Sequence, residues 1–160
     1  MKIVIALLVG LASASPVFAQ TNINLGGISA DPSAAVEISA DNLSVDQDTG
    51  TAVFSGNVVI GQGALRLSAG SVRVVYAETT GDIAQLMASG GVTFVTDTQA
   101  AEAASADYNL TTGQLILSGN VLLSQGASAL SADKMTVDLT SGTAQMSGRV
   151  RTVFQQDGGN

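Results

Sequence analysis

The chain has 160 residues, enough for one domain with a hydrophobic core, and it contains no cysteine, histidine or tryptophan. That composition excludes disulfide bridges, a thiol nucleophile and a histidine base. Six basic residues against thirteen acidic ones give a formal net charge of −7. This balance argues against nucleic acid, which selects basic patches, and against simple electrostatic adhesion to an anionic membrane surface.

The first element in chain order is a leader. Lys2 supplies a positive charge, Ile3–Leu11 is apolar, and Val17-Phe18-Ala19 has the small-residue pattern of a signal-peptidase site. The apolar run is shorter than the roughly twenty residues that a transmembrane helix needs. We therefore expect a signal peptide at 1–19, cleaved near Ala19, and a soluble mature protein outside the cytoplasm.

The remainder divides into three parts. Residues 20–34 and 156–160 are rich in glycine, asparagine and glutamine, so we expect a flexible N-terminal segment and a disordered tail. Between them, at 35–155, apolar residues alternate with polar ones, as in Leu65-Arg66-Leu67. A period of two indicates half-buried strands. The sequence thus predicts one all-β domain.

A repeated phrase organises this domain. "FSGNVVIGQG" at Phe54 returns as "LSGNVLLSQG" at Leu117, with looser echoes at "ASGGV" and "MSGRV". Its glycines, Gly56, Gly90, Gly119 and Gly148, are spaced by 34, 29 and 29 residues. A glycine within a strand often marks a bulge or bend. Tandem bent hairpins, with eight long strands or up to sixteen short ones, would stack into a curved two-sheet wrap.

Two further features belong to the repeat. A three-residue marker, Ser-Ala followed by a third residue, precedes each glycine. The third residue is Asp41, Asp107 or Asp133 in three units and Gly70 in the remaining one. We interpret these positions as equivalent strand ends. Residues 82–104 break the regularity, and we expect a longer loop there.

The residues that could bind a metal or take part in catalysis have simpler structural interpretations. Asp46, Asp48 and Gly50 faintly resemble a calcium loop, but the EF-hand ligand spacing is not met, so a solvated hairpin turn is expected. Serines have no histidine base, and the arginines Arg66, Arg73, Arg149 and Arg151 are expected on exposed strand faces. No enzyme activity, metal or cofactor is predicted.

The stretch from Val36 to Phe154 resembles the OstA-like domain family of lipopolysaccharide-transport proteins. The features that carry the resemblance are Ile38-x-Ala40-Asp41, the phrase beginning at Phe54 and the second copy "LSGNVLLSQGASALSADKMTVD". Gly70 departs from the family's usual Asp. The resemblance implies a twisted, open β-jellyroll in the periplasm of a Gram-negative bacterium.

The same resemblance implies a carrier that shields the acyl chains of lipopolysaccharide between the inner and outer membranes. A cleavable leader with nothing after the domain favours an LptA-like layout. The implied partners are lipopolysaccharide, an LptC-like inner-membrane protein, an LptD-like outer-membrane protein, and further copies joined head to tail by strand pairing.

The candidate lipid-binding groove follows from alternation, with Val36, Ile38 and Phe54 also matching the family motif. We expect its residues to point inward, although a shift of one residue would invert the set. They are Val36, Ile38, Phe54, Val58, Ile60, Leu65, Leu67, Leu115, Leu117, Val121, Leu123, Met135 and Val137.

Two alternatives remain open from the residues. One is a secreted structural β-solenoid or adhesin fragment, which would be a parallel helix with a closed core and no lipid affinity. The other is a generic lipid carrier. The apolar face itself leaves open whether the interior closes as an ordinary core or stays open as a trough.

Overall fold

The structure is a computed structural model that describes residues 22–24, 31 and 33–154. All regular secondary structure in these residues is β-strand. The eleven strands are β1 (Asn22–Asn24), β2 (Val36–Ser39), β3 (Asn42–Asp46), β4 (Thr51–Gln62), β5 (Leu65–Tyr76), β6 (Ile83–Val95), β7 (Gln99–Asn109), β8 (Gln114–Gln125), β9 (Ser128–Asp138), β10 (Thr143–Ser147) and β11 (Arg151–Val153).

The strands form one antiparallel sheet in the order β1-β10-β9-β8-β7-β6-β5-β4-β2, with β3 also pairing with β4 and β11 with β9. Every pairing is between antiparallel strands. Short turns therefore connect neighbours, and the strand order follows the chain from β2 to β10. This topology excludes the parallel solenoid and confirms the predicted open, all-β jellyroll.

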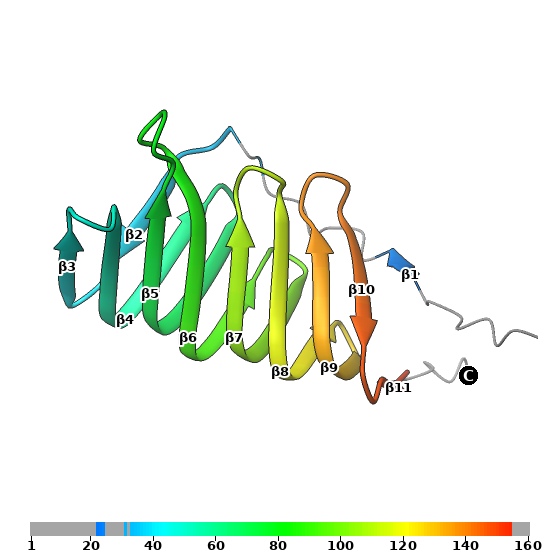
Figure 1. Ribbon diagram of the computed structural model, residues 1–160. Helices are drawn as coiled ribbons and strands as arrows, with labels where there is room; N and C mark the ends of the chain where they lie inside the picture. The colour runs from blue at the N-terminus through cyan, green and yellow to red at the C-terminus, as the bar shows by residue number, and fades with distance from the viewer. Residues whose placement is uncertain (1–21, 25–30, 32, 155–160) are drawn as a thin grey trace, which may run out of the picture.

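The long strands bend near their middles, so the single sheet folds into two layers (Figure 1). The front layer in Figure 1 contains β3, β10 and the halves of β4–β9 next to the turns at 47–50, 77–82, 110–113 and 139–142. The back layer contains β2, β11 and the other halves. The bends lie along the lower edge of the view, and the turns at the other ends of the strand halves form the rims of the two layers, which we call the mouth.

The bends of β4, β6 and β8, and the connection from β10 to β11, each contain two successive left-handed residues. In β4 these are Gly56, with φ of 78°, and Asn57, with φ of 46°. The strand register shifts there, between Ser55 and Val58. An extra residue in one strand increases the local twist and bends the ladder. The other pairs are Gly90 and Gly91, Gly119 and Asn120, and Gly148 and Arg149. The predicted role of the repeated glycines is thus confirmed.

At each bend glycine, a residue of the neighbouring segment occupies the space that a side chain would need. A Cβ on Gly119 would lie 2.8 Å from the Cβ of Ala104, and one on Gly56 would lie 2.6 Å from Oδ2 of Asp41. The four facing residues are Asp41, Gly70, Ala104 and Asp133. At Gly70 an added Cβ would lie 3.1 Å from the carbonyl oxygen of Gly90, so this bend packs backbone against backbone.

The prediction that Asp107 is equivalent to Asp41 and Asp133 is wrong. The bend position of β7 is Ala104, and Asp107 lies three residues beyond it, where its carboxylate accepts hydrogen bonds from Nε2 of Gln85 at 2.8 Å. The triplet Ser105-Ala106-Asp107 resembles the marker in letters alone. The strand register, which the residue types alone do not reveal, places Asp107 away from the bend.

The loop predicted at 82–104 is also wrong, because β6 and the first half of β7 occupy this range. Alanine and glycine are frequent in these strands and weaken the apolar alternation. The strand number, eleven, lies between the eight and sixteen that were expected.

The predicted leader at 1–19 and tail at 156–160 lie outside the described residues. Of the segment 20–34, which was expected to be flexible, the structure describes β1 and residues 31, 33 and 34. The backbone of β1 pairs with β10 at the edge of the front layer, with Ile23 opposite Ala144.

Candidate functional site

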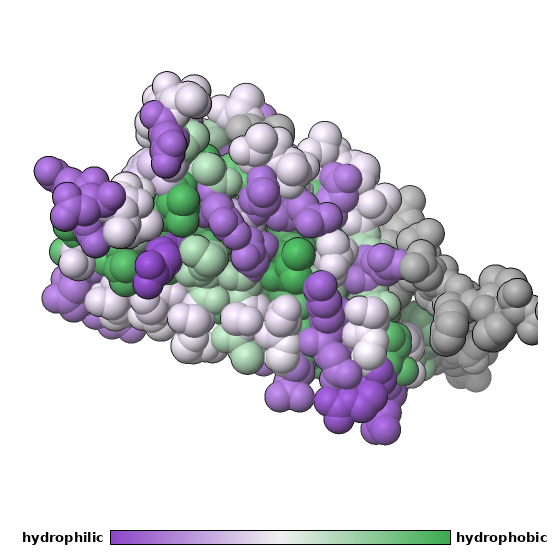
Figure 2. Space-filling model, viewed as in Figure 1, coloured by the Kyte–Doolittle hydropathy of each residue, from purple (hydrophilic) through white to green (hydrophobic). Residues whose placement is uncertain are grey.

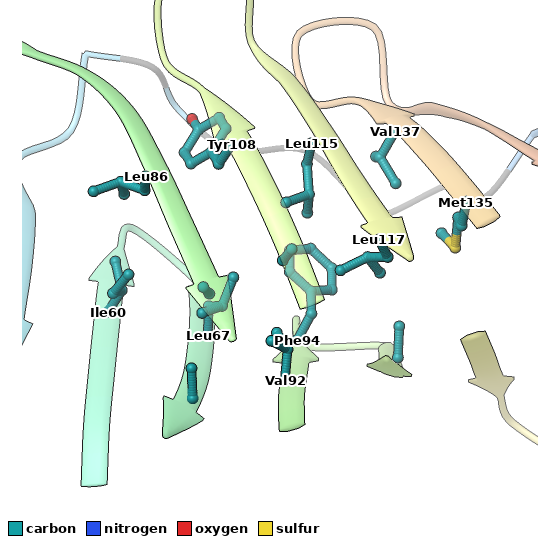
Figure 3. Close-up of a cluster of buried hydrophobic side chains, with 14 of the residues drawn as sticks. Ile60, Leu67, Leu86, Val92, Phe94, Tyr108, Leu115, Leu117, Met135 and Val137 are labelled. Carbon is teal, nitrogen blue, oxygen red and sulfur yellow. The ribbon is translucent and has the colours of Figure 1, made fainter. Parts of the chain in front are cut away.

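The interior between the two layers contains the cluster of buried hydrophobic side chains of the described chain. Side chains of both layers point into it, and Phe94 lies at its centre beside Leu117 (Figure 3). Phe94, Leu117 and Met135 are each 0% exposed. Because the strands alternate, the outward positions between these residues carry the polar side chains.

The structure places all thirteen candidate groove residues on this interior face. Val36, Ile38 and Phe54 are half-buried against the cluster, near the end of the stack formed by β2 and β3. The other ten are buried: Val58, Ile60, Leu65, Leu67, Leu115, Leu117, Val121, Leu123, Met135 and Val137. Ser39 and Val59, their outward neighbours in sequence, are exposed. One cluster therefore contains the whole set.

The sequence reasoning missed the contributions of β6, β7 and the second half of β5. The buried residues there are Val72, Val74, Leu86, Ala88, Val92, Phe94, Ala101, Ala106 and Tyr108. The alternation of Leu86 with Ala88, and of Val92 with Phe94, was a usable signal. The glycines and alanines around these residues weaken that signal and favour the predicted loop instead.

Charged side chains stay outside this interior. The buried polar residues of the described chain are Gln62, Thr96 and Gln99, none of which carries a charge. Arg66, Arg73, Arg149 and Arg151 are exposed, as expected. The interior is thus a surface of aliphatic and aromatic groups, suited to hydrocarbon and to no ion.

Charged side chains on the outside of the molecule form hydrogen bonds at bends and turns. Arg149 forms an ion pair with Asp133, with Nη2 2.6 Å from Oδ1, and this hydrogen bond lowers the pKa of the Asp133 carboxyl. In the turn that faintly resembled a calcium loop, Oδ1 of Asp46 accepts hydrogen bonds from the backbone N–H groups of Asp48 and Thr49. The Thr49 bond is the main cause of a lowered pKa of Asp46. This is the expected hairpin turn.

One buried hydrogen bond joins the two layers near the mouth. The phenol of Tyr108, in the front layer, donates to Oε1 of Gln62, in the back layer, at 2.9 Å. Burial raises the pKa of Tyr108, which keeps the phenol protonated as a donor. Beneath the ring lies a small apolar pocket between the layers, lined by Ile60, Leu65, Leu67, Leu86, Ala88, Ala106 and Tyr108.

The two ends of the stack carry exposed apolar side chains. At one end Leu43 and Val45 of β3 are 56% and 62% exposed; at the other, Val153 of β11 and the following Phe154 are 57% and 73% exposed. Figure 2 shows mostly polar and small side chains over the front of the molecule, with green apolar surface among them, including at the β3 end. Edge strands have unpaired backbone groups, so both ends can accept another strand.

Within 22–24, 31 and 33–154, no group of three or more His, Cys, Asp or Glu residues is placed to hold a metal ion. In that part of the chain, no helix has the length and apolar character needed to cross a membrane.

Fold and site together define a class: a two-layered β-jellyroll with free edges at both ends of its strand order and an aliphatic interior. Residues 37–143 match the family described as LptA/(LptD N-terminal domain) LPS transport protein. The chain belongs to this family, which confirms the predicted membership, and its role lies in lipopolysaccharide transport.

A solved structure agrees with the fold. LptH, described as the LptA homologous periplasmic component of the lipopolysaccharide transport device from Pseudomonas aeruginosa, matches with a TM-score of 0.71 and 17% sequence identity. The match covers 79% of this chain and 99% of that chain. At this identity the likeness concerns the fold. No curated protein sequence matches the chain.

Proposed function

We propose that the chain is a periplasmic carrier that shields the acyl chains of lipopolysaccharide in the interior between its two layers, on the way from the inner to the outer membrane. In this proposal the leader at 1–19 is cleaved near Ala19. The observation that carries it is the continuous apolar interior, which runs across the stack from Ile38 to Met135 with no charged side chain among its buried residues.

The physical reason for such a carrier is the hydrophobic effect. Each methylene exposed to water costs about 0.8 kcal/mol, so a lipid with several acyl chains does not cross an aqueous compartment unshielded. A wall of alternate strand residues covers hydrocarbon without needing specific polar contacts. The many strands extend this wall along the stack (Figure 1).

Occupancy requires movement of the layers. Interior residues such as Phe94, Leu117 and Val121 are 0% exposed, so the side chains of the two layers already fill the space between them. An acyl chain can enter when the layers separate at the mouth, where each turn links two strands of the same layer. The bends, held by paired backbone, act as the fixed side.

We further propose that copies of the chain join head to tail, and that an LptC-like protein and an LptD-like protein use the same two ends. The end formed by β2 and β3 and the end formed by β1, β10 and β11 differ, so strand addition at one end leaves the other free. Exposed apolar residues at both ends, such as Val45 and Phe154, support this arrangement.

The first experiment measures binding. The purified mature protein is incubated with lipopolysaccharide and, separately, with phospholipid, and co-migration is scored. We expect co-migration with lipopolysaccharide and much less with phospholipid. Binding of neither lipid would contradict the carrier function, and equal binding of both would favour a generic lipid carrier.

The second experiment locates the site by photo-crosslinking. Ile38 is half-buried and faces the interior, whereas its neighbour Ser39 is exposed on the outer face, so the pair is a matched test of phase. A photoreactive residue at Ile38, or at the half-buried Phe54, should capture lipopolysaccharide in cells. Capture from Ser39 but not from Ile38 would show that the outer face binds the lipid.

A further inference from the structure

Tyr108 and Gln62 form a buried polar pair in an interior that is mostly apolar. The two side chains are 5% and 2% exposed, and they reach toward each other from β7 and from the end of β4. Nε2 of Gln62 also donates to the backbone oxygen of Ala34 at 3.2 Å. Each polar group of the glutamine is thus paired, and the pair ties together the front layer, the back layer and the segment before β2.

The tyrosine is a departure from the repeat. Four residues beyond the bend positions Gly70 and Asp133, the strands β5 and β9 carry Val74 and Val137, both buried in the interior. The same step from Ala104 in β7 leads to Tyr108. A valine there would complete the aliphatic wall, whereas the tyrosine, labelled in Figure 3, reaches Gln62 of the other layer through its hydroxyl.

The pair separates two spaces. On the outer side lies an open pocket lined by Gln62 together with Ala34, Val36, Gly81, Asp82, Ile83, Leu110 and Thr111. On the inner side lies the apolar pocket beneath the Tyr108 ring, with Ile60 and Leu86 on its walls. The hydrogen bond therefore stands between a solvent-accessible entrance and the hydrocarbon-like interior.

We propose that Tyr108 and Gln62 form a clasp that closes the mouth, and that an acyl chain passes from the outer pocket into the interior only after this hydrogen bond breaks. The proposal deepens the carrier function and rests on it. An unpaired buried phenol or amide is costly, so the empty protein favours the closed clasp. A lipid that fills the interior offsets that loss with buried hydrocarbon.

The test is the variant Tyr108→Phe, which removes the hydroxyl and keeps the ring. Tyr76→Phe is the matched control, because Tyr76 is the chain's other tyrosine and is 38% exposed. The probe is a fluorescent fatty acid, mixed rapidly with the lipid-free mature protein. We expect association about five-fold faster for Tyr108→Phe, the factor that corresponds to one ordinary hydrogen bond, and no change for Tyr76→Phe.

A lipid-free measurement separates failure of the clasp from failure of the carrier function. Backbone hydrogen exchange at the ends of β4 and β7 should be about five-fold faster in Tyr108→Phe than in the wild type or Tyr76→Phe. If no variant binds the probe, the carrier function fails and the exchange rates alone decide the clasp. The clasp proposal would be overturned if hydrogen exchange in Tyr108→Phe were as slow as in the wild type. It would also be overturned if Tyr108→Phe bound the probe but associated with it no faster than the wild type does.

A second variant tests the clasp independently if Tyr108→Phe does not fold. Gln62→Met keeps the length of the side chain and removes its polar atoms, so it should speed association in the same way. Gln62→Met also removes the hydrogen bond to the backbone oxygen of Ala34, so its effect can be the larger one. In the double variant, Tyr108→Phe should add nothing to the effect of Gln62→Met, because the hydrogen bond between the two side chains is already lost. Additive effects would show that the residues act separately and would contradict a clasp.

Discussion

At the scale of single residues, the bend glycines adopt a left-handed backbone conformation and also leave room for a neighbouring residue. Gly119 has a φ of 84°, a conformation that side chains disfavour, and its missing Cβ leaves the space that the methyl group of Ala104 fills. Gly126, in a turn at the mouth, has a φ of 56° and no neighbour within 4 Å of an added Cβ. The two positions therefore separate backbone strain from steric overlap.

Gly126→Ala should destabilise the protein by about 1–2 kcal/mol, the cost of a left-handed alanine. Gly119→Ala should cost about 3 kcal/mol or more, because the clash with Ala104 adds to the strain. The free energy of unfolding of both variants can be measured by urea denaturation. Equal losses would show that the close packing of the bend contributes nothing.

The Asp133–Arg149 pair gives the bend after β10 a dependence on pH. Arg149 lowers the pKa of the Asp133 carboxyl in the folded chain. The unfolded chain therefore takes up this proton first as the pH falls. The contribution to stability is present above about pH 4, the ordinary range of an aspartate, and is lost as the pH falls through the lower, folded value.

Asp133→Asn should therefore lower the melting temperature at pH 7 and leave it close to the wild-type value at the acid end of the titration. The effect should be small, because both side chains are exposed. Thermal unfolding at low ionic strength, followed from pH 7 downward, measures it, and Arg149→Gln should show the same pattern. A difference that stays constant with pH would contradict the ion-pair explanation.

At the scale of elements, the alternation of apolar residues predicted the phase of β4, β5, β8 and β9. It did not recover β6 and the first half of β7, where alanine and glycine replace the larger aliphatic residues. These segments form strands because they pair with a strand on each side. Ala101, for example, pairs with Phe94 of β6 and with Leu123 of β8. Strand preference here is set by the flanking ladders and not by the segment itself.

At the scale of the whole molecule, the free ends of the stack determine how copies assemble. β3 pairs with β4 alone, and its Leu43 and Val45 are more than half exposed. The double variant Leu43→Lys/Val45→Lys places charges on this edge, which natural proteins use to block strand addition. We expect self-association to weaken at least about ten-fold, a change of about 1.4 kcal/mol.

Light scattering over a range of protein concentrations measures that change. Val95→Lys is a suitable control, because Val95 is 40% exposed on the outer face of β6, a strand between β5 and β7 and away from both ends. The control should self-associate as the wild type does. If the double variant did so as well, the β3 edge would not be the head-to-tail contact.

The sequence by itself determined the strand class, the place of most bends and the family, and its alternation favoured the inward set of thirteen residues without excluding a shift by one residue. These features are local, because alternation assigns a face within one strand and a glycine marks its own bend. Only the tertiary structure decided that Ala104 and not Asp107 faces a bend glycine, and that Tyr108 reaches Gln62. The physical reason is that ladder register and the packing of two layers join residues far apart in the chain, and a period of two carries no information about the partner across the interior.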